Sequence, residues 1–120
     1  MTATPAPDGV DPYERVRALC LALPGTSERP SHGAATWFVG KRTFVSAADL
    51  GHDDRRALWL AAPAGVQESL VDTDPDRFFR PPYVGRRGWL GVYLDVPTDW
   101  DELEALIVDA HRLIGSAARR

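Results

Sequence analysis

The stretch Pro81-Pro82-Tyr83-Val84-Gly85-Arg86-Arg87-Gly88-Trp89-Leu90-Gly91-Val92-Tyr93 decides the fold class, because it leads into a half-buried strand. Every second residue from Leu90 to Val96 is Leu or Val, an alternation that indicates a strand with one face buried against helices. Trp89 and Tyr93 would then project from the other face, with a shallow gap at Gly91 between them. This exposed aromatic face is a candidate binding surface.

Two basic turns are predicted in this chain. Residues 81–93 are expected to form a β-hairpin whose turn places two arginines between glycines. Residues 36–39 and 42–46 are rich in β-branched and aromatic side chains, and Gly40-Lys41 between them predicts a second hairpin. The two turns would expose four basic side chains: Lys41, Arg42, Arg86 and Arg87.

The rest of the chain predicts helices and strands around these hairpins. Asp11 and Asp99 suit the N-caps of the first and last helices, and Gly115 is expected to end the last one. The remaining predicted elements are a strand over residues 56–61 and a helix over residues 64–71. The order helix, three strands, helix, two strands, helix predicts an α+β fold, with an antiparallel sheet of about five strands and helices on one face. We expect a disordered lead-in over residues 1–10 and one domain over residues 11–117.

Net charge, hydropathy and cysteine count limit the classes of protein to which this chain can belong. The 120 residues carry a formal net charge of −3, which counts against a protein that is basic over its whole surface. No apolar run is long enough to cross a bilayer and no signal peptide is present, so we expect a cytoplasmic protein without membrane contact. The single cysteine, Cys20, excludes an internal disulfide and a cysteine-based zinc site, and it lies on the apolar stripe of the first helix.

A second candidate site involves Glu28, His32 and Trp37. Residues 28–33 read as a loop before the first strand, where a carboxylate and an imidazole could form an acid–base pair or bind a small ligand. Simple solvation of the loop, or a structural hydrogen bond, is the competing interpretation. No nucleophile, phosphate-loop or dinucleotide motif is present, so we expect no enzyme activity and no cofactor.

A calcium site is not predicted. Asp72, Asp74 and Asp76 alternate like the start of an EF-hand loop, but position six is Arg77 and position twelve is Tyr83. These aspartates are better explained as turn and capping residues.

The order of several short motifs resembles the MmcQ/YjbR family over roughly residues 12–115. The motifs are Leu23-Pro24-Gly25-Thr26 with Glu28, Gly40-Lys41 with Phe44, Pro82-Tyr83 with Trp89, and Ala110-His111-Arg112-Leu113. The resemblance implies a CyaY-like α+β fold in which two hairpins act as wings, and it implies DNA binding. The chain departs from the family pattern at Ala61-Ala62-Pro63, where relatives carry a lysine, and at Gly88 and Gly91, where they carry polar side chains.

Two functional hypotheses follow. In the first, Lys41, Arg42, Arg86 and Arg87 contact DNA phosphates weakly and in a salt-sensitive way, while Trp89 and Tyr93 offer stacking or shape contacts. In the second, the aromatic face of Trp37, Trp89 and Tyr93 binds a small molecule or a protein and no nucleic acid is involved. The sequence does not give an oligomeric state.

Overall fold

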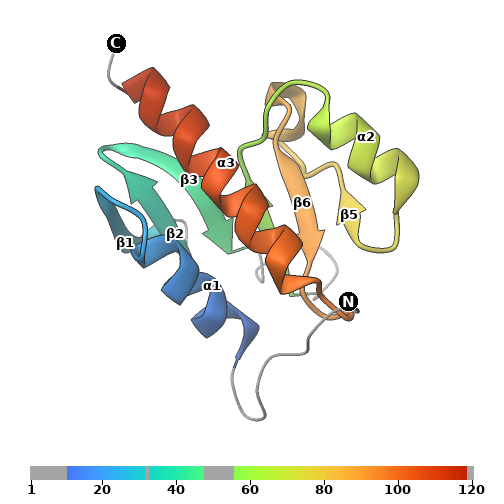
Figure 1. Ribbon diagram of the computed structural model, residues 1–120, viewed down its shortest axis with the longest axis horizontal. Coiled ribbons are helices and arrows are strands. Elements are labelled where there is room, and N and C mark those ends of the chain that lie inside the picture. Colours follow the sequence, from blue (N-terminus) through green and yellow to red (C-terminus); the bar gives the residue numbers. More distant parts are fainter. Residues whose placement is uncertain (1–10, 32, 48–55, 119–120) are drawn as a thin grey trace.

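Six antiparallel strands and three α-helices form the part of the chain that the computed structural model describes, residues 11–31, 33–47 and 56–118 (Figure 1). The expected lead-in over residues 1–10 lies outside these residues. The strands lie in the order β1-β2-β3-β4-β6-β5. The elements are α1 (Pro12–Leu21), β1 (Thr26–Ser31), β2 (Ala34–Val39), β3 (Arg42–Ala47), β4 (Ala57–Leu60), α2 (Val66–Thr73), β5 (Phe78–Phe79), the 3₁₀ helix η1 (Gly85–Arg87), β6 (Leu90–Tyr93) and α3 (Trp100–Ala118).

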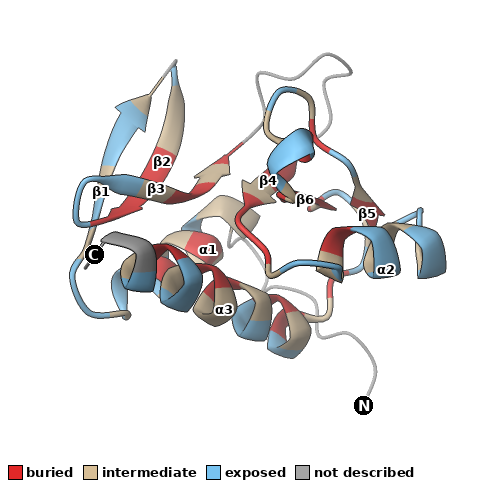
Figure 2. Ribbon diagram, turned by 90° about the horizontal axis from the view of Figure 1, so that it is seen from above, coloured by how far each residue is buried: buried red, intermediate tan, exposed pale blue. Residues whose placement is uncertain are grey.

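The helices pack on one side of the sheet, as the predicted α+β class requires. Figure 2 shows α1 and α3 below the strands, with α2 beside β5 at the sheet edge. Leu90, Val92 and Leu94 are buried in the core together with Leu103 and Ile107 of α3. The alternation that begins at Leu90 therefore does point one face of β6 toward the helices.

Aspartate side chains cap α1 and α3, as their sequences predict. Asp11 Oδ1 accepts a hydrogen bond of 2.8 Å from the Tyr13 backbone N–H, and Asp99 Oδ1 accepts one of 3.1 Å from that of Glu102. The expected end of the last helix at Gly115 is wrong, since α3 continues to Ala118.

The segment predicted as a loop over residues 28–33 belongs largely to strand β1. Thr26–Ser31 pairs along its length with β2, from Thr26 opposite Val39 to Ser31 opposite Ala34. No strand was predicted here, because an edge strand of polar residues with Pro30 in it carries no apolar alternation. This strand and the two-residue β5 are the two strands of the sheet that were not predicted.

The hairpin predicted over residues 81–93 is also wrong, although its second strand is present. β6 pairs with β4 on one side and with the two-residue strand β5 on the other. Residues 81–88 instead form a turn and then η1, so no strand precedes the two arginines directly. The glycines and prolines that suggested a hairpin turn instead lie in the longer segment that connects β5 to β6.

Candidate nucleic-acid interface

The sheet brings the two basic turns to the same end of the molecule. Val45 of β3 lies opposite Leu60 of β4, which lies opposite Leu90 of β6, so the three form one row. β3 and β6 run in the same direction, because each is antiparallel to β4 between them. Arg42 lies three residues before Val45, and Arg87 lies three residues before Leu90. Both turns therefore extend past the same end of the sheet, as the upper part of Figure 1 shows.

The lateral offset between the turns follows from the strand order. β3 and β6 are separated by β4 alone, which corresponds to about 10 Å across the sheet at the level of that row. The right-handed twist of the sheet turns the two strands away from each other beyond the row. The two basic turns thus lie apart from each other at one end of the sheet.

The basic side chains at this end are exposed and lack acidic neighbours. Lys41, Arg42, Arg86 and Arg87 are all exposed, as their turn positions predict. Within residues 11–31, 33–47 and 56–118, none of them takes part in an ion pair. Their positive charge is therefore not neutralised by described carboxylates.

Other arginines of the protein are used within the fold. Four form ion pairs with Asp or Glu: Arg17, Arg56, Arg77 and Arg112. Two more lie over aromatic rings, Arg15 at 4.8 Å from the centre of the Trp100 ring and Arg29 at 4.0 Å from that of Phe38. Arg87 likewise lies over a ring, at 5.6 Å from the centre of that of Trp89, so the basic turns differ from the four ion-paired arginines in lacking a described acidic partner.

The side chain of Gln67 of α2 forms hydrogen bonds with the backbone of the turn that carries Arg86 and Arg87. We call residues 85–88 the arginine turn. Gln67 is 5% exposed, and its Nε2 donates hydrogen bonds of 2.8 Å to the Gly85 carbonyl and 2.5 Å to the Trp89 carbonyl. These carbonyls flank the arginine turn, so one amide fixes both of its ends. Nothing in the sequence around Gln67 points to this role, because its acceptors are 18 and 22 residues away.

A third arginine lies against the arginine turn. A Cβ atom added at Gly85 would come within 2.6 Å of Arg80 Cγ, so the Arg80 stem occupies the space that a side chain at position 85 would need. Arg80 is exposed, and no ion pair joins it to another described residue. Arg80 was not predicted as a site residue, because it precedes the two prolines and stands apart from the Arg86-Arg87 pair.

The predicted aromatic face is largely absent. Trp37 is fully buried and Trp89 is 6% exposed, so neither presents a ring to solvent. Tyr93 is half-buried, and its ring stacks on that of Phe79 with 4.6 Å between the ring centres. The expected gap at Gly91 is filled, because a Cβ there would lie 2.4 Å from atoms of the Phe79 ring.

Glu28 is engaged in a structural cluster. Arg17 Nε and Nη2 donate to its two carboxylate oxygens at 2.6 and 2.9 Å, and Trp37 Nε1 donates to one of them at 2.8 Å. The hydrogen bonds from Arg17 outweigh partial burial, and with that from Trp37 they hold the pKa of Glu28 below its ordinary value. His32, its expected partner, lies outside the described residues. The carboxylate is thus committed to joining α1 to the sheet.

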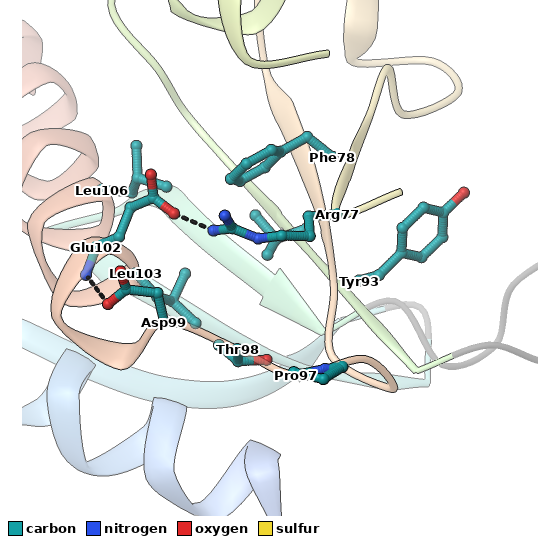
Figure 3. Close-up of a pocket in the computed structure, with 10 residues that line it drawn as sticks. Arg77, Phe78, Tyr93, Pro97, Thr98, Asp99, Glu102, Leu103 and Leu106 are labelled. Carbon is teal, nitrogen blue, oxygen red and sulfur yellow. Dashed lines mark hydrogen bonds and ion pairs between the residues drawn. The ribbon is translucent and has the colours of Figure 1, made fainter. Parts of the chain in front are cut away.

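A shallow hollow lies between the β5–β6 edge and the start of α3 (Figure 3). Arg77 crosses it to pair with Glu102 and also contacts Asp74 at 3.1 Å. Burial opposes the charge of Arg77, but the two carboxylates outweigh it and raise the pKa of the guanidinium. The hollow has a volume of about 10 Å³, the lower limit for a single water. It is closed by its own ion pair and offers no room for an organic ligand.

No metal site is present among residues 11–31, 33–47 and 56–118, where no three His, Cys, Asp or Glu side chains converge. Burial raises the pKa of the Cys20 thiol to about 12, and the charge of Glu28 adds to the rise, so this cysteine is a core residue. No described helix combines the length and apolar character needed to cross a membrane.

Comparison with known proteins identifies one family. A family model described as YjbR matches residues 21–113, which is more than half of the chain and includes both basic turns. No curated protein matches the chain.

Proposed function

Since this chain belongs to the YjbR family, we propose that it binds DNA weakly through the phosphate backbone, with the β2–β3 turn and the arginine turn as its two contact points. One observation carries the proposal. Two exposed basic turns without described acidic partners extend from the same end of one sheet.

The arrangement suits phosphate contacts better than recognition of a small ligand. Arg42, Arg86 and Arg87 present guanidinium groups that match phosphate geometry and stay charged at any physiological pH. With Trp37 and Trp89 in the core, the alternative of a ligand bound on an aromatic face has lost its main residues. No side chain at the two turns is held in a way that would read base edges, so the proposed binding is independent of sequence.

The protein's net charge of −3 limits the affinity. Attraction is local to one end of the sheet, while the remaining surface carries more acidic than basic charge. Four phosphate contacts predict a slope of about −3.6 for the logarithm of the binding constant against that of salt concentration, and micromolar or weaker affinity at physiological salt.

Fluorescence anisotropy with a labelled blunt duplex, over about 20 to 200 mM NaCl, tests the proposal. The double substitution Arg86→Gln with Arg87→Gln should weaken binding and reduce the slope to about −1.8, because two of four contacts are lost. Arg56→Gln is a matched control for Arg86→Gln. It removes the same charge at the opposite end of the sheet, where β4 begins.

The proposal is wrong if the wild-type protein does not bind the duplex at the lowest salt. It is also wrong if Arg56→Gln weakens binding as much as Arg86→Gln, since attraction would then not be localised at the basic turns.

A further inference from the structure

Tyr83 is the most exposed large hydrophobic side chain among the described residues, and it lies on the loop that leads into the arginine turn. It is 79% exposed, compared with 45% for Leu21 and 41% for Leu113. A tyrosine ring of this exposure is not held in place by core packing.

The backbone at Tyr83 is strained. Tyr83 has φ of +67°, and no other described residue apart from glycine has a positive φ. A hydrogen bond of 2.6 Å from the Val84 N–H to the Pro82 carbonyl closes a three-residue γ-turn around it. Glycine or asparagine would adopt this conformation at lower cost, and bulky residues are genuine outliers in it. Backbone strain of this kind concentrates at binding sites.

The rest of the loop restrains the backbone that carries Tyr83. Pro81 is buried and its carbonyl accepts a 3.0 Å hydrogen bond from the Gly85 N–H, so the turn is closed a second time. Pro82 has a fixed φ, and Gln67 holds Gly85 at the other end. The strained turn therefore presents the Tyr83 ring from a stiff support.

The charges near Tyr83 define the ligand chemistry. Arg80 lies three residues before Tyr83 and Arg86 three residues after it, and both are exposed. An aromatic ring flanked by basic side chains is the arrangement by which proteins hold single strands, with bases stacked on the ring and phosphates on the cations. Bases within a duplex are already stacked and paired, so the ring can accept only an unpaired base.

We propose that Tyr83 stacks on an unpaired base of DNA while Arg80 and Arg86 contact the phosphates beside it. The preferred substrate is then a duplex next to single-stranded DNA. This inference rests on the proposed DNA binding and specifies the substrate class of the same surface.

The test compares a blunt duplex with the same duplex carrying a single-stranded overhang, for the wild-type protein, Tyr83→Gly and Tyr83→Phe. The wild-type protein should bind the overhang substrate at least about fivefold more tightly, the lower limit for one stacked base. Tyr83→Phe should keep this gain, because the ring remains. Tyr83→Gly should lose it while binding the blunt duplex as before.

Two further measurements separate stacking from a structural role. A 2-aminopurine in the overhang should be quenched by the wild-type protein and by Tyr83→Phe but not by Tyr83→Gly. The urea midpoint of Tyr83→Gly should rise, because glycine relieves the positive φ, whereas a structural tyrosine would lower it on removal.

The inference is overturned if the overhang gives the wild-type protein no gain, or if Tyr83→Gly keeps the gain. In that case the proposed function would still hold if binding to the blunt duplex depends on Arg86 and Arg87. Absence of any binding to the blunt duplex rejects the proposed function itself.

Discussion

Replacing Gln67 with leucine should loosen the arginine turn at both ends. Leucine has a similar volume and a high helix propensity, so α2 and its packing are largely retained. What is lost is the side-chain amide that donates to the carbonyls of Gly85 and Trp89. The substitution thus removes two hydrogen bonds without removing any charge.

The cost differs between the two carbonyls. The Gly85 oxygen keeps its 3.0 Å hydrogen bond from the Gly88 N–H, so it loses one of two partners, worth about 1 kcal/mol. The Trp89 carbonyl is left unsatisfied in a buried position, at about 1–3 kcal/mol. Together we expect the free energy of unfolding to fall by about 2–4 kcal/mol, against a total of about 5–15 kcal/mol for a domain.

Urea denaturation followed by tryptophan fluorescence measures this loss. Glu68→Leu is the matched control, since it introduces the same side chain at the next, exposed position of α2 and should change stability by less than about 0.5 kcal/mol. Amide hydrogen exchange should accelerate in residues 85–89 of Gln67→Leu before it does so in the sheet.

Duplex affinity should also fall, although Gln67 is buried, because its hydrogen bonds hold the backbone that carries Arg86 and Arg87. Equal stability of Gln67→Leu and Glu68→Leu would show that Gln67 does not hold the arginine turn, as would unchanged exchange in residues 85–89.

Two further predictions concern stability. The lowered pKa of Glu28 means that its hydrogen bonds with Arg17 stabilise the protein above the ordinary carboxyl value of 4.5 and are lost as the pH falls through the lowered pKa. Glu28→Gln should therefore be less stable than the wild-type protein by about 1 kcal/mol at neutral pH, and this difference should vanish in acid. A difference in stability that persists at the lowest pH would contradict the prediction. Gly91→Ala should lower the free energy of unfolding by about 1–3 kcal/mol, because its Cβ would meet the Phe79 ring at 2.4 Å. In the matched control Gly115→Ala, the Cβ makes an ordinary 3.6 Å contact with Val39 inside a helix, so stability should rise by up to about 1 kcal/mol; two changes of the same sign would contradict this account.

The candidate interface was predicted in part. Turn chemistry placed Lys41, Arg42, Arg86 and Arg87 at exposed positions, and the structure confirms that exposure. Their common location at one end of the sheet depends on strand order and pairing, which no local pattern encodes. The same holds for Arg80, whose contact with Gly85 arises from the path of the intervening prolines.

The aromatic residues show where reasoning from alternation fails. Trp89 precedes β6, so the period of two that holds from Leu90 does not fix the direction of its side chain. The indole N–H of Trp37 donates a hydrogen bond to Glu28, and this polar partner allows the tryptophan to be fully buried. Phe79 covers Gly91 because β5 pairs with β6, and a two-residue strand gives no periodic signal.

Residue patterns along the chain were enough to predict the α+β class, the helix caps, four of the six strands in outline, the family resemblance and the exposure of two basic turns. These features depend on residue periodicity, capping and turn preferences over a few neighbouring positions, and therefore can be read locally. Only the tertiary structure decided that the basic turns share one end of the sheet, that Gln67 fixes the arginine turn and that Tyr83 is presented in a strained conformation. Each of these three features depends on contacts between distant segments or on a backbone angle imposed by the surrounding structure. At these positions, burial and hydrogen bonding across the fold outweighed the local preferences of the residues.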